Sequence, residues 1–355
     1  MKIGVFFGGQ SREREVSFAG GRTVYDNLDK SIFTAVPIFI DSWGNFILLD
    51  WQFVYKGTIR DFYPPVSHIP KSENGFQIYT ESLGELSEKQ QEEMIAKIGK
   101  KIQPSDFKKL FDFAFLTLHG SYGEDGNIQG LLEWYHIPYS GAGILSSAIG
   151  IDKAIQKKLF SQLGFLQPKT HTISRSEFSE ENNYAYFFNT LQQELGLPFV
   201  VKAAHQGSSI GISVLNKKAT VTDFVEALEK AFFIEKITSE KWKGCSQKQK
   251  VTFLVNLTDI REGIGLPVLV RQETEKIRIS HPEKLLLFLN NHFENSENTL
   301  FLEALESETE VLLESFVNGK EFSCIVVQDE NGKPIALPPT EIVKGAELFD
   351  YRSKY

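Results

Sequence analysis

Residues 199–214 read Phe-Val-Val-Lys-Ala-Ala-His-Gln-Gly-Ser-Ser-Ile-Gly-Ile-Ser-Val, which is an apolar strand, a short polar loop and a second apolar strand. Lys202 lies at the end of the first strand, where its ammonium group can meet a polyphosphate. Two glycines leave the loop backbone open and two serines add donors; these are Gly207, Gly211, Ser208 and Ser209. The pattern fits a loop that covers phosphates, and it equally fits an ordinary β-hairpin with a glycine–serine turn.

The length and composition of the chain predict a folded protein with more than one domain. Its 355 residues exceed one typical core, so we expect two or three domains, and 41% hydrophobic with 24% charged residues is ordinary for a globular protein. A net charge of −8 disfavours binding to nucleic acid or to a membrane surface. There is no apolar run of about 20 residues, and the chain enters a strand too early for a signal peptide, which predicts a cytoplasmic protein. Cys245 and Cys324 are expected to be reduced thiols.

The first 118 residues predict a parallel sheet covered by helices. Strands are expected at 2–7, 34–40 and 112–118, with a glycine turn and a helix over 11–28 after the first strand. Residues 58–111 are interpreted as an insertion with a polar helical part around 85–100. The ligand crevice of such a sheet lies at the carboxyl ends of its strands. Glu13 and Glu15 fall at the helix start in this crevice, where capping is the simpler role.

The segment His119-Gly-Ser-Tyr-Gly-Glu-Asp-Gly126 follows the third strand and precedes a helix expected at 127–135. Turn formation explains its glycines but does not explain why His119 and Glu124 occur together, so we favour a functional role for these two. The Pro/Gly-rich stretch 136–143 predicts the first domain boundary.

The remainder predicts a second unit with one further insertion. An amphipathic helix is expected over 146–163, and its Lys153, Lys157 and Lys158 are solvated unless the helix leans over the same phosphates as Lys202. Residues 216–310 show one short helix at 222–234 and then a charge-mixed stretch without an evident site. Strands at 311–317 and 321–328 are expected to form an antiparallel pair that completes a small sheet with 199–214.

Seven blocks, taken in order, resemble the D-alanine–D-alanine ligases of the ATP-grasp superfamily. They are FFGGQSREREVS (6–17), HGSYGEDGNIQGLLE (119–133), IPYSGAG (137–143), Asp152-Lys153, VVKAAHQGSSIGIS (200–213), VLLESFVNGKEFS (311–323) and FDYRSKY (349–355). The resemblance implies an α/β fold with a parallel-sheet N-terminal domain (1–141, insertion 58–111), an ATP-grasp small lobe (142–318, insertion about 238–306) and the truncated start of a C-terminal lobe (319–355).

The resemblance also implies a chemistry: ATP phosphorylates the carboxylate of one D-alanine, and the acylphosphate joins the amine of a second, for peptidoglycan precursor synthesis. Glu13 would pair with the first alanine's ammonium, and Ser208 would link that pocket to Tyr355. His119, Glu124 and Lys354 would line the substrate side. The nucleotide residues implied in this way are Lys153 and Lys202 with the loop Gly207, Ser208, Ser209 and Gly211 for the phosphates, Glu314, Ser315 and Val317 for adenine, and Glu321 for the ribose.

The chain departs from the family pattern at three places. Ala203 and Gln206 stand where the family has a proline and an acid. The family's magnesium ligands are expected beyond Tyr355, so Mg²⁺ is expected for the complete enzyme and no metal site is assigned here. Two alternatives stay open: a non-catalytic nucleotide-binding or regulatory fragment, and a ligase with another acceptor such as D-lactate. A homodimer is also possible.

Overall fold

The computed structural model describes residues 1–180, 183–272 and 275–343, which form three main sheets with their helices. The first sheet has the strand order β4-β3-β2-β1-β5, and β1 runs parallel to both β2 and β5. Its strands are β1 (Lys2–Gly8), β2 (Thr34–Ile40), β3 (Phe46–Leu49), β4 (Gly99–Ile102) and β5 (Phe113–Leu116), and its helices are α1 (Arg14–Asn27), α2 (Glu88–Ile95), α3 (Phe107–Leu110) and α4 (Asn127–Trp134).

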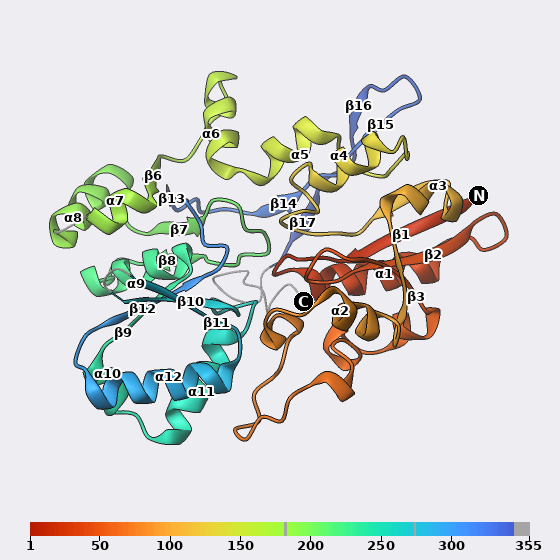
Figure 1. Ribbon diagram of the computed structural model, residues 1–355. Helices are drawn as coiled ribbons and strands as arrows, with labels where there is room; N and C mark the ends of the chain where they lie inside the picture. The colour runs from red at the N-terminus through yellow and green to blue at the C-terminus, as the bar shows by residue number, and fades with distance from the viewer. Residues whose placement is uncertain (181–182, 273–274, 344–355) are drawn as a thin grey trace.

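Successive phenylalanines of β1 show why this strand is apolar on both faces. Phe7 packs on Phe18 of α1, with ring centroids 5.6 Å apart, whereas Phe6 packs edge-on against Phe107 and Phe111 at 5.6 and 5.4 Å. Neighbouring residues of a strand point to opposite faces, so α1 and α3 cover the two sides of the sheet (Figure 1).

The first sheet is mixed rather than parallel throughout, which corrects one expectation. β3 and β4 pair antiparallel at its edge, and β4 lies inside the stretch 58–111 that was interpreted as an insertion. The sequence of β4 is Gly-Lys-Lys-Ile, and lysines on a short edge strand leave no apolar run to detect. The polar helix expected around 85–100 is α2.

The second sheet has the order β6-β13-β7-β8 and is antiparallel. Phe224 of α9 stacks on Phe188 of α8 at 5.1 Å and meets Phe199 of β7, which fixes these helices to the sheet. The elements of this unit are α5 (Ile144–Ile151), α6 (Lys153–Gln162), β6 (Thr170–Ser174), α7 (Arg175–Glu180), α8 (Tyr184–Leu195), β7 (Phe199–Ala203), β8 (Ser213–Leu215), α9 (Val221–Phe232) and β13 (Glu310–Ser315).

Two expectations for this unit were wrong. The single helix predicted over 146–163 is two helices, because Asp152 adopts an extended backbone and its carboxylate accepts a hydrogen bond from Ile155 N–H at 2.9 Å, capping α6. The strand predicted at 321–328 does not complete the second sheet. It divides into β14 (Glu321–Ser323), paired with β17 (Thr340–Ile342), and β15 (Val326–Gln328), paired with β16 (Pro334–Ala336).

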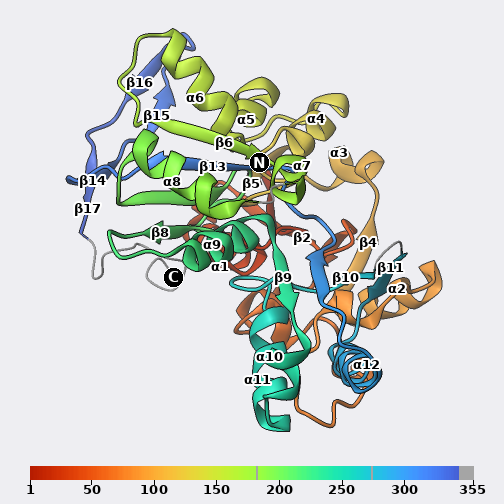
Figure 2. The same cartoon turned by 90° about the vertical axis from the view of Figure 1, so that its left-hand side faces the viewer.

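The third sheet, ordered β11-β10-β12-β9, occupies most of the stretch that we had interpreted as a second insertion. Leu285, Leu289 and Phe293 of α12 are buried against it together with Trp242. Figures 1 and 2 both place α10, α11 and α12 at the end of the molecule remote from β15 and β16. The elements are β9 (Ile234–Ile237), α10 (Ser239–Lys243), α11 (Gln247–Thr258), β10 (Val268–Gln272), β11 (Glu275–Ile279), α12 (Pro282–Asn295) and β12 (Leu300–Ala304).

Arg12 joins the segment after β1 to the loop after α11. Its guanidinium N–H groups donate to the backbone carbonyls of Ile260, Gly263 and Ile264 at 2.9–3.0 Å, and its charge lies 4.0 Å from the ring centre of Phe233. The first and third units are therefore joined by a half-buried cation.

The predicted domain boundaries, 141/142 and 318/319, fall between α4 and α5 and between β13 and β14; they stay predictions. Among the described residues, no helix has both the length and the apolar character needed to cross a membrane.

Candidate functional site

Glu13 lies just after β1 and is only 4% exposed. Its carboxylate accepts a hydrogen bond from the hydroxyl of Ser208. A Cβ atom added at Gly207 would lie 2.6 Å from the Glu13 carboxylate, and one added at Gly120 would lie 2.9 Å from it. Two glycines from distant parts of the chain thus make room for one carboxylate. Burial raises the pKa of Glu13, against the lowering effect of the Ser208 hydrogen bond.

His119 and Glu124 face each other beside Glu13. His119 Nδ1 lies 3.7 Å from Glu124 Oε1, and Gly120 N–H donates to Glu124 Oε2 at 2.7 Å. The hydrogen bond with Glu124 raises the pKa of His119. Burial acts to raise the pKa of Glu124, but the bonds from His119 and Gly120 outweigh it and the pKa is lowered. Each member of the pair therefore favours the charged form of the other.

The loop between β7 and β8 is held by Lys153 at the start of α6. Lys153 Nζ donates to the backbone carbonyls of Gln206 at 2.6 Å and Ala204 at 3.2 Å. Ser208 and Ser209 both have positive φ angles, 47° and 60°, which non-glycine residues seldom adopt and which cluster at functional sites. Burial lowers the pKa of Lys153, and the nearby positive charge of Lys202 lowers it further. The two ammonium groups therefore lie close enough to repel each other.

Glu314 on β13 is buried between two lysines. Its carboxylate forms ion pairs with Lys202 of β7 and, at 2.8 Å, with Lys157 of α6. Burial acts to raise the pKa of Glu314, but the lysine charges keep it low. We had expected Lys157 to be solvated, and the spacing of residues along α6 gave no sign that it faces β13.

Buried Glu308 was missed in the sequence. It lies 2.7 Å from His205 Nδ1 and accepts from Gln206 Nε2 at 3.0 Å, while His205 Nε2 lies 3.3 Å from Asp152. The hydrogen bond with Glu308 raises the pKa of His205. Glu308 therefore places a carboxylate directly beside Gln206. A buried glutamate far along the chain carries no local signal of this role.

A cavity of about 660 Å³ brings the residues from both units together. Five of the predicted site residues line it, namely Glu124, Lys153, Gly207, Ser208 and Ser209. Glu13 adjoins it through Ser208, and His119 through Glu124. Gly211 lies at the loop's end, just before β8.

The remaining predicted nucleotide residues lie along and beyond β13. The hydroxyl of Ser315 accepts a hydrogen bond from the backbone N–H of Lys169 at 3.0 Å. Val317 is exposed, and Glu321 is the first residue of β14. Lys354 and Tyr355 lie outside the described residues.

Two family models match the chain. The model described as D-ala D-ala ligase N-terminus matches residues 2–142, and that described as D-ala D-ala ligase C-terminus matches 159–256 and 291–355. A D-alanine–D-alanine ligase of Chloroherpeton thalassium is 30% identical over 267 residues, covering 74% of this chain and 67% of the relative. This chain belongs to the D-alanine–D-alanine ligase family.

Other members of the ligase family are similar over shorter or more divergent alignments. The D-alanine–D-alanine ligase of Geobacillus thermodenitrificans is 33% identical over 64% of this chain, and the chain spans only 57% of that relative's length. The solved D-alanine–D-alanine ligase of Coxiella burnetii matches with a TM-score of 0.55 at 20% identity, over 97% of this chain and 71% of its own. A D-Ala:D-Ser ligase from Enterococcus faecalis gives 0.53 at 24%, over 100% and 73%. These structures support the fold alone.

The residues suit the nucleotide of the ligase family better than its metal. Lys153, Lys157 and Lys202 can hold a polyphosphate. Within 1–180, 183–272 and 275–343, no group of three or more His, Cys, Asp or Glu side chains could hold a metal ion. None of the described residues is assigned to magnesium.

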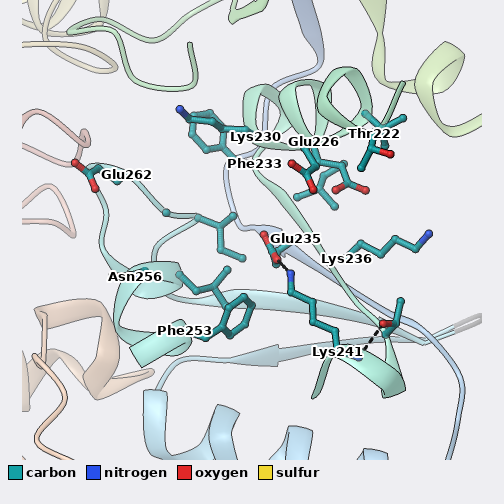
Figure 3. A pocket seen from close by; sticks show the side chains of 17 residues that line it. Thr222, Glu226, Lys230, Phe233, Glu235, Lys236, Lys241, Phe253, Asn256 and Glu262 are labelled. Carbon is teal, nitrogen blue, oxygen red and sulfur yellow. Dashed lines mark hydrogen bonds and ion pairs between the residues drawn. The ribbon is translucent and has the colours of Figure 1, made fainter. Parts of the chain in front are cut away.

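A separate cavity of about 610 Å³ lies against α9, β9 and α11, and none of the site residues predicted for the ligase lines it (Figure 3). Its lining combines four glutamates with three lysines, and Figure 3 shows Glu235 turned toward Lys241, 2.9 Å away. Burial, followed by repulsion from Glu235, raises the pKa of Glu229 in this cavity to about 7.

Glu229 should make the stability of the protein depend on pH. The folded state holds this proton more tightly than the unfolded state, so stability is lost as pH rises from about 4.5 to about 7. After allowance for solvent screening of a partly exposed group, we expect Glu229→Gln to gain about 1 kcal/mol at pH 8 and almost nothing at pH 4. Thermal unfolding at both pH values measures this. Exposed Glu93 on α2, remote from this cavity, changed to Gln, is the control, and an equal gain at both pH values for Glu229→Gln would contradict the prediction.

Proposed function

We propose that the protein uses ATP to join two D-alanines through an acylphosphate, as a step of peptidoglycan precursor synthesis. The observation that carries this proposal is the contact between Ser208 and Glu13, because it brings the loop expected over the phosphates onto a buried carboxylate suited to an ammonium. Membership of the ligase family agrees with it. The cytoplasmic location and the homodimer stay predictions.

In the proposed reaction the chain's own residues bind and orient the two reactants. Glu13, when ionised, holds the ammonium of the first D-alanine, and Gly120 and Gly207 leave room for its carboxylate. His119, whose protonated form Glu124 favours, adds a positive charge beside the substrate carboxylate when it is protonated, and this charge favours the approach of the carboxylate to a phosphate. Lys153 and Lys202 offset charge on the phosphates, and ATP supplies the phosphoryl group that activates the carboxylate.

The activity is tested by ADP release from the purified protein in a coupled assay, with the dipeptide identified by mass spectrometry. We expect ADP release that depends on D-alanine and yields D-alanyl-D-alanine. Nucleotide binding without ADP release would favour the non-catalytic module. Release that depends on D-lactate in place of a second D-alanine would favour the other acceptor.

Lys202→Ala is expected to weaken binding of a non-hydrolysable ATP analogue by about tenfold to thirtyfold, or about 1.5–2 kcal/mol, through loss of a charge-assisted contact. Glu314 keeps its pair with Lys157, so the variant should fold. Calorimetry measures the affinity, and Lys217→Ala, on an exposed residue after β8, is the control. Unchanged affinity would mean that residues 199–214 form only a hairpin.

A further inference from the structure

Glu308 lies in the segment between β12 and β13 and is only 5% exposed. Both oxygens of its carboxylate contact side chains of the loop between β7 and β8. Oε2 lies 2.7 Å from His205 Nδ1, and Oε1 accepts a hydrogen bond from Gln206 Nε2 at 3.0 Å. His205 and Gln206 come directly before residues 207–209, which line the cavity of about 660 Å³. The proposed reaction assigns no role to Glu308, although this residue holds the loop at the edge of that cavity.

The same loop is bonded on two further sides. Lys153 Nζ donates to the backbone carbonyls on either side of His205, and the hydroxyl of Ser208 donates to Glu13. In the proposed reaction Lys153 and Glu13 also bind the phosphates and the ammonium, so their bonds to the loop must be shared with the substrates. The bonds from Glu308 need not be shared, because its carboxylate is buried and its negative charge repels phosphate.

The ring of His205 lies between two carboxylates. Its Nδ1 faces Glu308 at 2.7 Å, and its Nε2 faces Asp152 at 3.3 Å. A neutral imidazole has one N–H donor and an imidazolium has two, so only the protonated ring can donate to both carboxylates. Asp152 also caps α6, the helix that begins with Lys153. The protonated ring therefore joins the loop to Glu308 on one side and to the start of α6 on the other.

We propose that Glu308 is a positioning residue for the loop, acting through His205 and Gln206 to hold residues 207–209 where they can donate to the nucleotide phosphates. This inference rests on the proposed function, which places that loop over the phosphates. Donors that are held in place before the ligand arrives lose less conformational freedom when it binds, so the bonds from Glu308 strengthen nucleotide binding.

The negative charge of Glu308 acts in the opposite direction. This charge acts to raise the pKa of Lys153, which shows that it offsets part of the positive charge there. If Glu308 acted by its charge alone, its removal would strengthen the attraction between Lys153 and the phosphates. If Glu308 positions the loop, its removal weakens nucleotide binding. The two roles therefore predict opposite changes in affinity.

Glu308→Gln and Glu308→Ala distinguish these roles by calorimetry with a non-hydrolysable ATP analogue. The amide cannot form a charge-assisted bond with the imidazolium, so we expect the affinity to fall about fivefold in Glu308→Gln. It should fall about tenfold or more in Glu308→Ala, which removes the acceptor of both His205 and Gln206. Glu310→Gln and Glu310→Ala, at a partly exposed glutamate two residues later, are the matched controls and should leave the affinity unchanged. Unchanged or tighter binding by Glu308→Gln would overturn the proposal.

The pH profile of nucleotide binding gives a readout that a purely structural role would not move. The hydrogen bond with Glu308 raises the pKa of His205, and Asp152 raises it further. As pH rises through this pKa the ring keeps a single N–H, so affinity should fall. Glu308→Gln should move this fall to lower pH, and His205→Gln should abolish it, whereas titration of the nucleotide itself is common to all variants. A fall at the same pH in all three proteins would contradict the role of His205.

Hydrogen exchange of the nucleotide-free protein separates this inference from the proposed function. In Glu308→Gln the amides of residues 205–211 should exchange about threefold faster or more, whereas those of α9 should keep their rates. Unchanged exchange of this loop would overturn the inference whether or not the protein proves to be a ligase. Faster exchange, together with no nucleotide binding by the unchanged protein, would overturn the proposed function and with it the role of the loop at the phosphates.

Discussion

Glu13→Gln is expected to raise the KM for the first D-alanine about a hundredfold, or about 3 kcal/mol, and to leave the affinity for ATP nearly unchanged. Glutamine fits between Gly120 and Gly207 and can still accept from Ser208, so the variant removes the charge and little else. A buried carboxylate attracts a partner of opposite charge more strongly than an exposed one does, since little water remains to screen the pair.

Steady-state kinetics with each substrate varied in turn measure the two constants for Glu13→Gln. Glu15→Gln is the matched control, because Glu15 is two residues away but bonds to Ile59 N–H and Arg60 instead of the loop at 207–208. A change in the ATP constant without a change in the D-alanine constant would show that Glu13 does not hold the ammonium.

The raised pKa of Glu13 adds a pH dependence to the same prediction. Only the ionised carboxylate attracts an ammonium, so D-alanine binding should weaken as pH falls through that pKa, at a higher pH than for an ordinary glutamate. Glu13→Gln should remove this dependence from the D-alanine profile. Its persistence in the variant would assign the titration to another group, such as His119 or Glu124.

Arg12→Ala is expected to lower the free energy of unfolding by about 3–4 kcal/mol. The change leaves the carbonyls of Ile260, Gly263 and Ile264 without their donor and removes the cation from Phe233. Burial lowers the pKa of Arg12 to about 10, so the side chain is still a cation at neutral pH.

Urea unfolding monitored by tryptophan fluorescence measures the effect of Arg12→Ala. Arg12→Lys keeps the charge but cannot reach all three carbonyls. Its free energy of unfolding should therefore lie between those of the unchanged protein and Arg12→Ala. Arg22→Ala on α1, whose guanidinium lies farther from its aromatic partner at 5.8 Å, should cost less than 1 kcal/mol. Equal losses for Arg12→Ala and Arg22→Ala would mean that the joint contributes nothing specific.

The sequence predicted those strands, turns and helices whose residue patterns lie within one short stretch of the chain. The β1 strand, the Gly8-Gly9 turn and α1 follow from one apolar run and one helical repeat, and the strands of 199–214 follow from apolar runs on either side of a glycine–serine loop. The order of seven short blocks was enough to predict the family. These features can be predicted because each is determined by residues that are close together along the chain.

Contacts between distant residues decided the rest. β4 became a strand through pairing with β3, and the unit around β9–β12 formed from short runs whose partners lie up to 70 residues apart. Nothing near Glu314 in sequence shows that Lys157 and Lys202 will neutralise it, nor does anything near Gln206 point to Glu308. Charge balance and burial are properties of the packed interior, and no short stretch of sequence determines them.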